Sequence, residues 1–160
     1  MFDPEWDRVC SSCTAGIEEL SPGLYDHLHA RDTELVHVSR APIEKIRSEQ
    51  AARGWTFPWI SSHGSRFNYD FGVTVDPSVT PPFYNYRLQD MPDGGSFEGP
   101  GLSCFLRVGE RVFHTYSQYA RGLESTGGSY YYLDLTALGR QEEWEEPKGR
   151  SKHPAVPDFS

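Results

Sequence analysis

Two cysteines separated by two residues are the part of this sequence whose residue types and spacing could do chemistry. Cys10 and Cys13 enclose Ser11 and Ser12, and a helical pattern runs over residues 12–20. Side chains three positions apart share one face of a helix, so the two thiols lie close enough to form a disulfide or to share a metal ion. Unpaired N–H groups and a partial positive charge at the start of a helix favour a thiolate. We therefore expect a lowered pKa for Cys10, as in a redox-active dithiol.

Zinc binding is the first alternative for this pair of thiols. A structural zinc site needs four ligands, which usually come from a second such pair or from two histidines at suitable spacing. The sequence has no second Cys-x-x-Cys pair, and His27 and His29 lie two positions apart, which places them on different faces of a helix. The spacing therefore favours a redox dithiol over a zinc site. A third alternative is that the two thiols have no chemical role.

Length, charge and composition limit the class of protein. The chain has 160 residues, which is long enough for one domain with its own core. Its formal net charge is -8. A nucleic-acid-binding protein would be expected to carry a basic face, and none is visible. We expect neither a signal peptide nor a membrane-spanning segment, because no apolar run is long enough to cross a membrane. Three cysteines do not make a disulfide framework. We expect a cytoplasmic protein that binds neither nucleic acid nor membrane.

The first half of the chain alternates between helical and extended patterns. The predicted order is helix, helix, strand, helix, strand, over residues 12–20, 22–31, 34–39, 42–53 and 56–62. Pro42 is expected to start the third helix, with Ile43 and Ile46 facing inward, and Gly54 to end it. Strands that alternate with helices predict a parallel sheet covered by helices.

The second half contains a long loop, a hairpin and a charged tail. Residues 74–101 hold five prolines and four glycines, so this stretch is expected to be a functional loop or an insertion. Strands over 102–107 and 111–116 should form a β-hairpin, followed by a helix over 117–126. We therefore divide the chain into a domain over residues 1–138 and a loose, charged C-terminal tail over residues 139–160.

Several short blocks along the chain resemble one family of proteins. The first are Trp6 with Cys10-Ser11-Ser12-Cys13, residues 38–42 (VSRAP) and residues 54–62 (GWTFPWISS). Further blocks are residues 67–71 (FNYDF), 113–117 (FHTYS), 119–122 (YARG), 133–136 (LDLT) and 138–140 (LGR). The order of elements is similar to that of the thioredoxin superfamily, and the blocks resemble domain-of-unknown-function family 899, often labelled predicted dithiol-disulfide oxidoreductases.

The resemblance implies a thioredoxin-like α/β fold, in the peroxiredoxin-like arrangement of a central sheet flanked by helices. It also implies a thiol-disulfide oxidoreductase in which Cys10 attacks and Cys13 resolves the mixed disulfide. Such a protein needs no organic cofactor, and its partner would be a protein or small-molecule thiol or disulfide.

Two features depart from the thioredoxin pattern. Only nine residues precede Cys10 and they do not read as a strand, so the sheet would lack its middle member and keep two open edges. We expect either that the true start lies upstream or that the chain fills this gap in another way. Open edges and exposed aromatic side chains favour a homodimer. The second departure concerns the cis-proline that faces the dithiol in thioredoxins: Pro100 stands nearest to its place, and whether it is cis is open.

A thiol-dependent peroxidase is the second enzymatic alternative. Residues 57–62 and the hairpin also resemble peroxiredoxins, in which the reactive cysteine occupies the second position of the redox motif. Cys13 would then be the peroxidatic cysteine, and Cys10 could resolve its sulfenic acid.

A few further side chains are candidates for the site. Trp6 and Trp59 are expected to form walls of the dithiol pocket, or else to pack in the core. Arg40 and Arg121 could bind a substrate carboxylate or pair with Asp70 or Asp134. We expect His63 to lie in an exposed loop.

Two residues of the hairpin are also of interest. Cys104 is expected to be a small buried side chain. His114 could lie near the dithiol as an acid or base, or as a third ligand in a copper(I) or zinc carrier with Cys10 and Cys13, because soft thiolates select copper(I).

Overall fold

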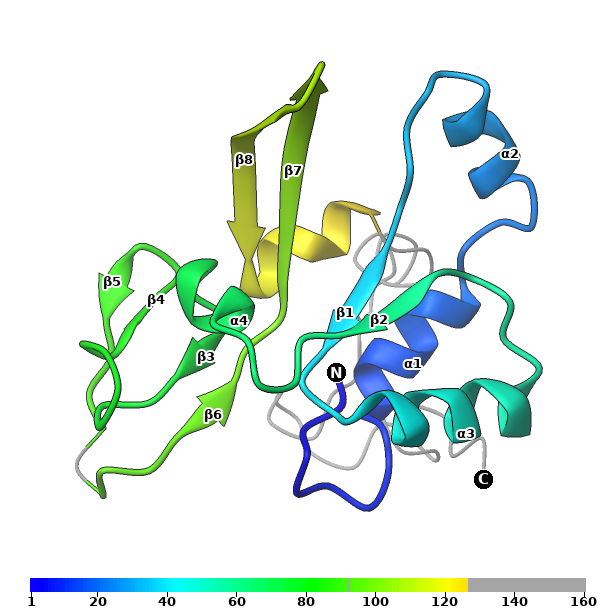
Figure 1. The fold of residues 1–160 in the computed structure, drawn as a ribbon. Helices are drawn as coiled ribbons and strands as arrows, with labels where there is room; N and C mark the ends of the chain where they lie inside the picture. Colours follow the sequence, from blue (N-terminus) through cyan, green and yellow to red (C-terminus); the bar gives the residue numbers. More distant parts are fainter. Residues whose placement is uncertain (92, 127–160) are drawn as a thin grey trace, which may run out of the picture.

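The structure is a computed structural model that describes residues 1–91 and 93–126 (Figure 1). Its first half contains α1 (Ser11–Glu18), α2 (Leu24–His29), β1 (His37–Ser39), α3 (Ile43–Arg53) and β2 (Trp59–Ser61). β1 and β2 pair in parallel, with His37 opposite Trp59 and Ser39 opposite Ser61. The parallel β-α-β unit predicted from the sequence is therefore confirmed, although both strands are shorter than expected.

Sequence signals define both ends of α3. Pro42 occupies the position before its first residue, where a fixed φ and a missing N–H cost nothing. Gly54 follows the last residue with a φ of 68°, a left-handed conformation that glycine adopts without strain. Ile46 is fully buried on the inner face, so the predicted start, end and inward face of this helix are all confirmed.

The core lies between α3, β2 and the first residues of the chain. Its buried members are Phe2, Val9, Ala41, Ile46 and Trp59. Phe2 is 3 % exposed, and its carbonyl accepts a hydrogen bond from the Ala41 amide at 2.9 Å. Phe2 and Val9, near the two ends of the first nine residues, therefore belong to the core packing.

Residues 74–101 are more ordered than a loop, which corrects the prediction from the sequence. After α4 (Phe67–Asp70) come four two-residue strands: β3 (Thr74–Val75), β4 (Phe83–Tyr84), β5 (Arg87–Leu88) and β6 (Phe97–Glu98). β3 pairs with β6 and β4 with β5, both antiparallel. The tight turn between β4 and β5 uses positive φ values at Asn85 (51°) and Tyr86 (63°), the backbone conformation that two-residue hairpin turns require.

The predicted hairpin is present and is longer than expected. β7 (Gly101–Val108) pairs with β8 (Arg111–Tyr119), and the register shifts once, between Cys104 and Phe105. The helix predicted over residues 117–126 is wrong for its first three residues, which continue β8. Ser117 is buried and its hydroxyl shares a hydrogen bond with Ser103 at 2.7 Å, so cross-strand pairing outweighs helix propensity there. Only η1 (Ala120–Thr126) is helical, and it is a 3₁₀-helix.

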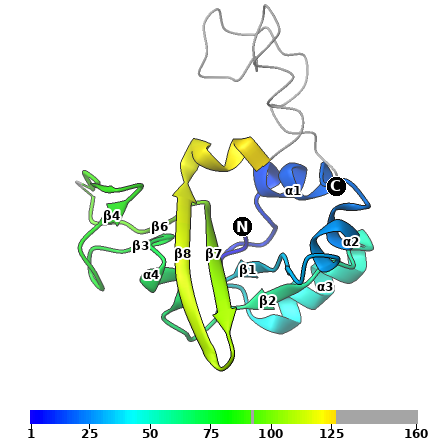
Figure 2. The ribbon, with the colours of Figure 1, turned by 90° about the horizontal axis from the view of Figure 1, so that it is seen from above.

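The hairpin and the parallel pair remain separate sheets within the described residues. Figure 2 shows the first residue of the chain between β7 and β1, with α1 and η1 together at one end of the molecule. None of the described residues forms a strand that joins the β1–β2 sheet to the β7–β8 sheet. The tail expected over residues 139–160, and Asp134 with its neighbouring motifs, lie outside the described residues.

Candidate dithiol site

Cys10 and Cys13 lie at the start of α1, as the sequence predicts. Cys10 is the residue that caps the helix, with φ −61° and ψ 122°, and its carbonyl accepts the first helical hydrogen bond from the Thr14 amide at 3.0 Å. The amide of Cys10 donates to the Met1 carbonyl at 2.9 Å. Both cysteines are partly buried and neither is in a disulfide. The first residues of the chain therefore hold the dithiol from one side.

The two thiols differ strongly in their affinity for a proton. The pKa of Cys10 falls from 9.0 to about 5, chiefly because the Cys13 thiol donates a hydrogen bond to the Cys10 sulfur, and backbone N–H groups at the helix start add to this. The pKa of Cys13 is raised, because its proton is held in that hydrogen bond and because the side chain is desolvated. A thiolate is the reactive form of cysteine, so Cys10 is the nucleophile that this arrangement favours.

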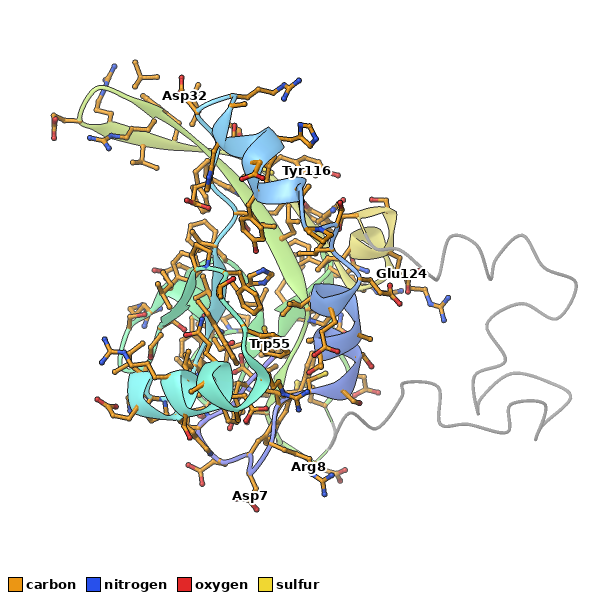
Figure 3. The ribbon with its side chains drawn as sticks, turned by 90° about the vertical axis from the view of Figure 1, so that its right-hand side faces the viewer. Asp7, Arg8, Asp32, Trp55, Tyr116 and Glu124 are labelled. Carbon is orange, nitrogen blue, oxygen red and sulfur yellow. The ribbon has the colours of Figure 1, made fainter. Side chains whose placement is uncertain are left out.

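Lys45 of α3 fixes the loop that leads into the dithiol. Its ammonium group donates to the Pro4 carbonyl at 3.0 Å and to the Trp6 carbonyl, and it lies 5.0 Å from the centre of the Phe2 ring. Trp6 is 38 % exposed on this loop. Figure 3 shows the neighbouring Asp7 pointing out of the molecule. Trp6 therefore lies at the surface, four residues before Cys10.

Trp59 packs in the core, which is the second of the two places expected for it. It is 4 % exposed and its indole N–H donates to the Ser39 hydroxyl at 2.9 Å. Its ring packs against those of Phe2 and Trp55, at centroid distances of 6.1 and 5.7 Å. In Figure 3, Trp55 lies between α1 and α3. Trp59 is thus a core residue.

Arg40 pairs with a residue that the sequence analysis did not consider. Its guanidinium lies 2.6 Å from the carboxylate of Glu98 on β6 and 3.8 Å from that of Asp3. Asp70, one of the two partners expected from the sequence, instead lies 3.6 Å from Arg66. The Arg40–Glu98 pair ties the short strands of residues 74–98 to the end of β1.

Pro100 lies in a tightly packed turn whose main contact is Tyr84, a residue that sequence reasoning missed. The Tyr84 hydroxyl donates to the Pro100 carbonyl at 2.8 Å and accepts from the Ala120 amide at 3.1 Å. Burial raises the pKa of Tyr84, and a negative charge on Cys13 raises it slightly further. Only its aromatic run, residues 83–86 (FYNY), marks it in the sequence.

His114 is held within the hairpin and against α4. His114 has its Nε2 atom 2.7 Å from the Ser117 hydroxyl, and its ring packs on Phe71 and Phe105. Among residues 1–91 and 93–126, no three side chains of His, Cys, Asp or Glu gather closely enough to hold a metal ion. The expected set of Cys10, Cys13 and His114 is therefore not assembled. His63 is exposed, as predicted.

Cys104 corrects another expectation, because its side chain is exposed instead of buried. β7 and β8 are exposed along most of their length in the described part of the chain, so neither face of the hairpin at Cys104 is core. Arg121 is the second residue of η1, and it is one of the residues that line an open cleft formed by β8, η1 and the β4–β5 turn.

These observations describe a mixed α/β protein with a polarised pair of thiols at the start of a helix. The chain belongs to a family of bacterial proteins of unknown function, DUF899, whose family model matches residues 1–155. The resemblance noted from the sequence blocks is confirmed at the level of this family. No curated protein and no solved structure is significantly similar to the chain. No helix in the described part of the chain has the length and apolarity needed to cross a membrane.

Proposed function

We propose that this protein is a thiol-disulfide oxidoreductase of thioredoxin-like fold that uses Cys10 and Cys13. The observation that carries the proposal is the place of Cys10 as the capping residue of α1, with Cys13 three residues further on; there the Cys13 side chain lowers the pKa of Cys10 to about 5. A thiol-disulfide exchange protein needs one thiol that is ionised near neutral pH and a second that stays protonated until it is used. This division of roles supports redox chemistry over a structural use of the pair.

The proposed reaction has two steps. The Cys10 thiolate attacks one sulfur of a substrate disulfide, so that a Cys10–substrate disulfide forms and the other substrate sulfur leaves as a thiolate that takes up a proton. Cys13 then loses its proton and attacks the Cys10 sulfur, which releases the second substrate thiol. The substrate gains two electrons and two protons, and the protein ends with a Cys10–Cys13 disulfide. A thiol reductant in a reducing compartment such as the cytoplasm would regenerate the dithiol.

Substitution of each cysteine separately tests this order of events. Cys13→Ser should accumulate a mixed disulfide with glutathione disulfide, because the resolving thiol is missing, and mass spectrometry of peptides should locate it at Cys10. Cys10→Ser should form such an adduct at Cys13 much more slowly at neutral pH, because the Cys13 thiol is still desolvated by burial. The proposal would be refuted if Cys10→Ser formed the adduct at Cys13 as fast as Cys13→Ser forms it at Cys10. It would also be refuted if glutathione disulfide did not oxidise the wild-type protein.

The peroxidase alternative requires Cys13 to be the peroxidatic thiolate. The raised pKa of Cys13 disfavours this role, because peroxide reacts with the thiolate. The same two variants distinguish the reactions: a peroxidase of this kind would lose all turnover of hydrogen peroxide in Cys13→Ser and form no stable adduct at Cys10.

A further inference from the structure

Two segments that are distant in the sequence line an open cleft of about 600 Å³. The first is residues 85–87, which form the turn between β4 and β5 and the start of β5, and the second is residues 116–122, which form the end of β8 and the start of η1. Sites for small ligands usually have volumes of roughly 300–1,000 Å³. The cleft is therefore large enough for a small organic molecule.

Direct contacts hold the two segments together. The Tyr86 hydroxyl donates to the Ser117 carbonyl at 2.7 Å, and the Tyr86 ring packs edge-on against that of Tyr119, at 5.4 Å between centroids. The Ala120 amide donates to the Tyr84 hydroxyl at 3.1 Å. The cleft is thus already formed without a ligand, so binding does not have to order its walls.

The described residues that line the cleft carry a charge opposite to that of the whole chain. They include Arg87 and Arg121 and no acidic residue, although the chain has 23 acidic residues against 15 lysines and arginines. No ion pair between described residues involves Arg87. Arg121 does have an interaction within the protein, so Arg87 is the first guanidinium to consider. Guanidinium groups bind carboxylates and phosphates through two parallel hydrogen bonds, so the cleft favours an anion.

Exposed aromatic rings on both segments add a flat apolar surface. Tyr86 is 68 % exposed on the turn, and Tyr116 is 57 % exposed on β8. Such rings pack well on planar groups. The amides of Asn85 and Gln118 also line the cleft and can both donate and accept hydrogen bonds. This combination fits a ligand that has a flat ring and an anionic group.

We propose that this cleft binds a small aromatic anion, whose carboxylate or phosphate pairs with Arg87 and whose ring packs on Tyr86 and Tyr116. An anion without a ring keeps only the ion pair, and a ring without a charge keeps only the aromatic contact, so both parts are needed for the full affinity. The site uses neither cysteine, so it can be tested independently of the proposed redox function.

The first experiment titrates the full isotope-labelled chain with two aromatic anions and follows its amide NMR signals. The probes are adenosine monophosphate and phenylacetate, and their uncharged counterparts are adenosine and phenylacetamide. At least one anion should shift the amide signals of residues 85–87 and 116–122 and should bind about tenfold tighter than its counterpart, because hydrogen bonds to a charged group are strong. The anion that binds more tightly shows whether the site prefers a phosphate or a carboxylate.

Two arginine variants test the ion pair. Arg87 is exposed on β5, so Arg87→Gln should fold normally, and it should weaken binding of the anion about tenfold while leaving the uncharged counterpart unaffected. Arg111→Gln is the matched control, because Arg111 also lies beside an aromatic ring, 5.2 Å from the centre of that of Phe113, at the other end of β8 and outside the cleft. It should change the affinity less than about twofold, since salt screens a distant exposed charge.

A third variant tests the aromatic contact. Tyr116→Leu should weaken binding of the anion and of its uncharged counterpart by the same factor, about threefold or more. The inference would be wrong if neither anion shifted these amide signals at concentrations up to about 10 mM. It would also be wrong if Arg87→Gln and Arg111→Gln weakened binding equally, or if the uncharged counterparts bound as tightly as the anions. A protein that reduces no disulfide would refute the proposed function and would leave these results unchanged.

Discussion

The carboxylate of Glu98 lies 2.6 Å from the guanidinium of Arg40, and 58 residues of sequence separate them. Thr74 and Asn68 also donate to this carboxylate, at 2.7 and 3.1 Å. The Glu98 side chain is only 8 % exposed, so its charge depends on these three donors. A single buried carboxylate therefore joins α4, β3 and β6 to the residue that follows β1, and it connects the short strands of residues 74–98 to the parallel pair.

Removing the cation of this pair should destabilise the protein strongly. Arg40→Met should lower the free energy of unfolding by about 2–4 kcal/mol, because it leaves a buried charge without its ionic partner. Arg66→Met is the control: its pair with Asp70 is 3.6 Å long with both side chains exposed, and its loss should cost less than about 1 kcal/mol. Urea unfolding followed by tryptophan fluorescence measures both. Equal losses would mean that Glu98 does not depend on Arg40.

The stability of the reduced protein should rise with pH above neutrality. Between pH 5 and 9 the folded protein has released the Cys10 proton that the unfolded chain, with a pKa of 9.0, still holds. Unfolding then takes up a proton, so the free energy of unfolding increases with pH. Between pH 7 and 8.5 we expect a gain on the order of 1–2 kcal/mol. Above pH 9 the raised pKa of Cys13 acts in the opposite direction.

The pH range chosen keeps other groups out of this measurement. Burial lowers the pKa of His37 to about 4, which makes stability rise with pH only between about 4 and 6.5, the unfolded value. Urea unfolding at pH 7 and 8.5 under a phosphine reductant isolates the thiol contribution. Cys10→Ser should remove the increase. A variant that keeps the full pH dependence would show that another group causes it.

Local sequence signals predicted most of the first half of the fold. The position of Cys10 at a helix start, the bounds of α3 between Pro42 and Gly54, and the parallel pairing of β1 with β2 follow from residue types and spacing. These features depend on neighbouring residues and on a strong apolar pattern, as at Ile46. The hairpin was predicted for the same reason, because Gly109 marks its turn with a φ of 60°.

Contacts between distant residues could not be predicted in the same way. Nothing in the sequence indicates that Arg40 meets Glu98 or that Tyr84 reaches Pro100, because each pair depends on how separate segments pack. Cross-strand contacts of Ser117 and Tyr119 kept β8 extended where residue preferences favoured a helix. The same limit explains why Cys104 was expected to be buried. Alternating side chains along a strand indicate a buried face only where another element covers that face, and the sequence does not show whether one does.

Trp59 should contribute to stability and not to thiol chemistry. Trp59→Phe removes the indole hydrogen bond to the buried Ser39 hydroxyl at 2.9 Å and part of the ring volume in the core, which together should cost about 2–3 kcal/mol in the free energy of unfolding. The pKa of Cys10, measured from thiolate absorbance in the folded variant, should not change. A shift of the Cys10 pKa by more than half a unit, about 0.7 kcal/mol, would show that Trp59 does influence the dithiol.

The three cysteines should differ in how their alkylation depends on pH. An ordinary thiol reacts with iodoacetamide slowly at pH 6 and about tenfold faster for each pH unit until the pH nears its pKa, and the exposed Cys104 is the comparison within the same protein. Cys10, with a pKa of about 5, should already react at its full rate at pH 6. Peptide mass spectrometry of reduced protein alkylated for short times at pH 6, 7 and 8 measures each site separately. Cys104→Ser should leave the Cys10 profile unchanged. If Cys10 instead follows the same rising curve as Cys104, its thiolate is not stabilised and the proposed oxidoreductase loses its nucleophile.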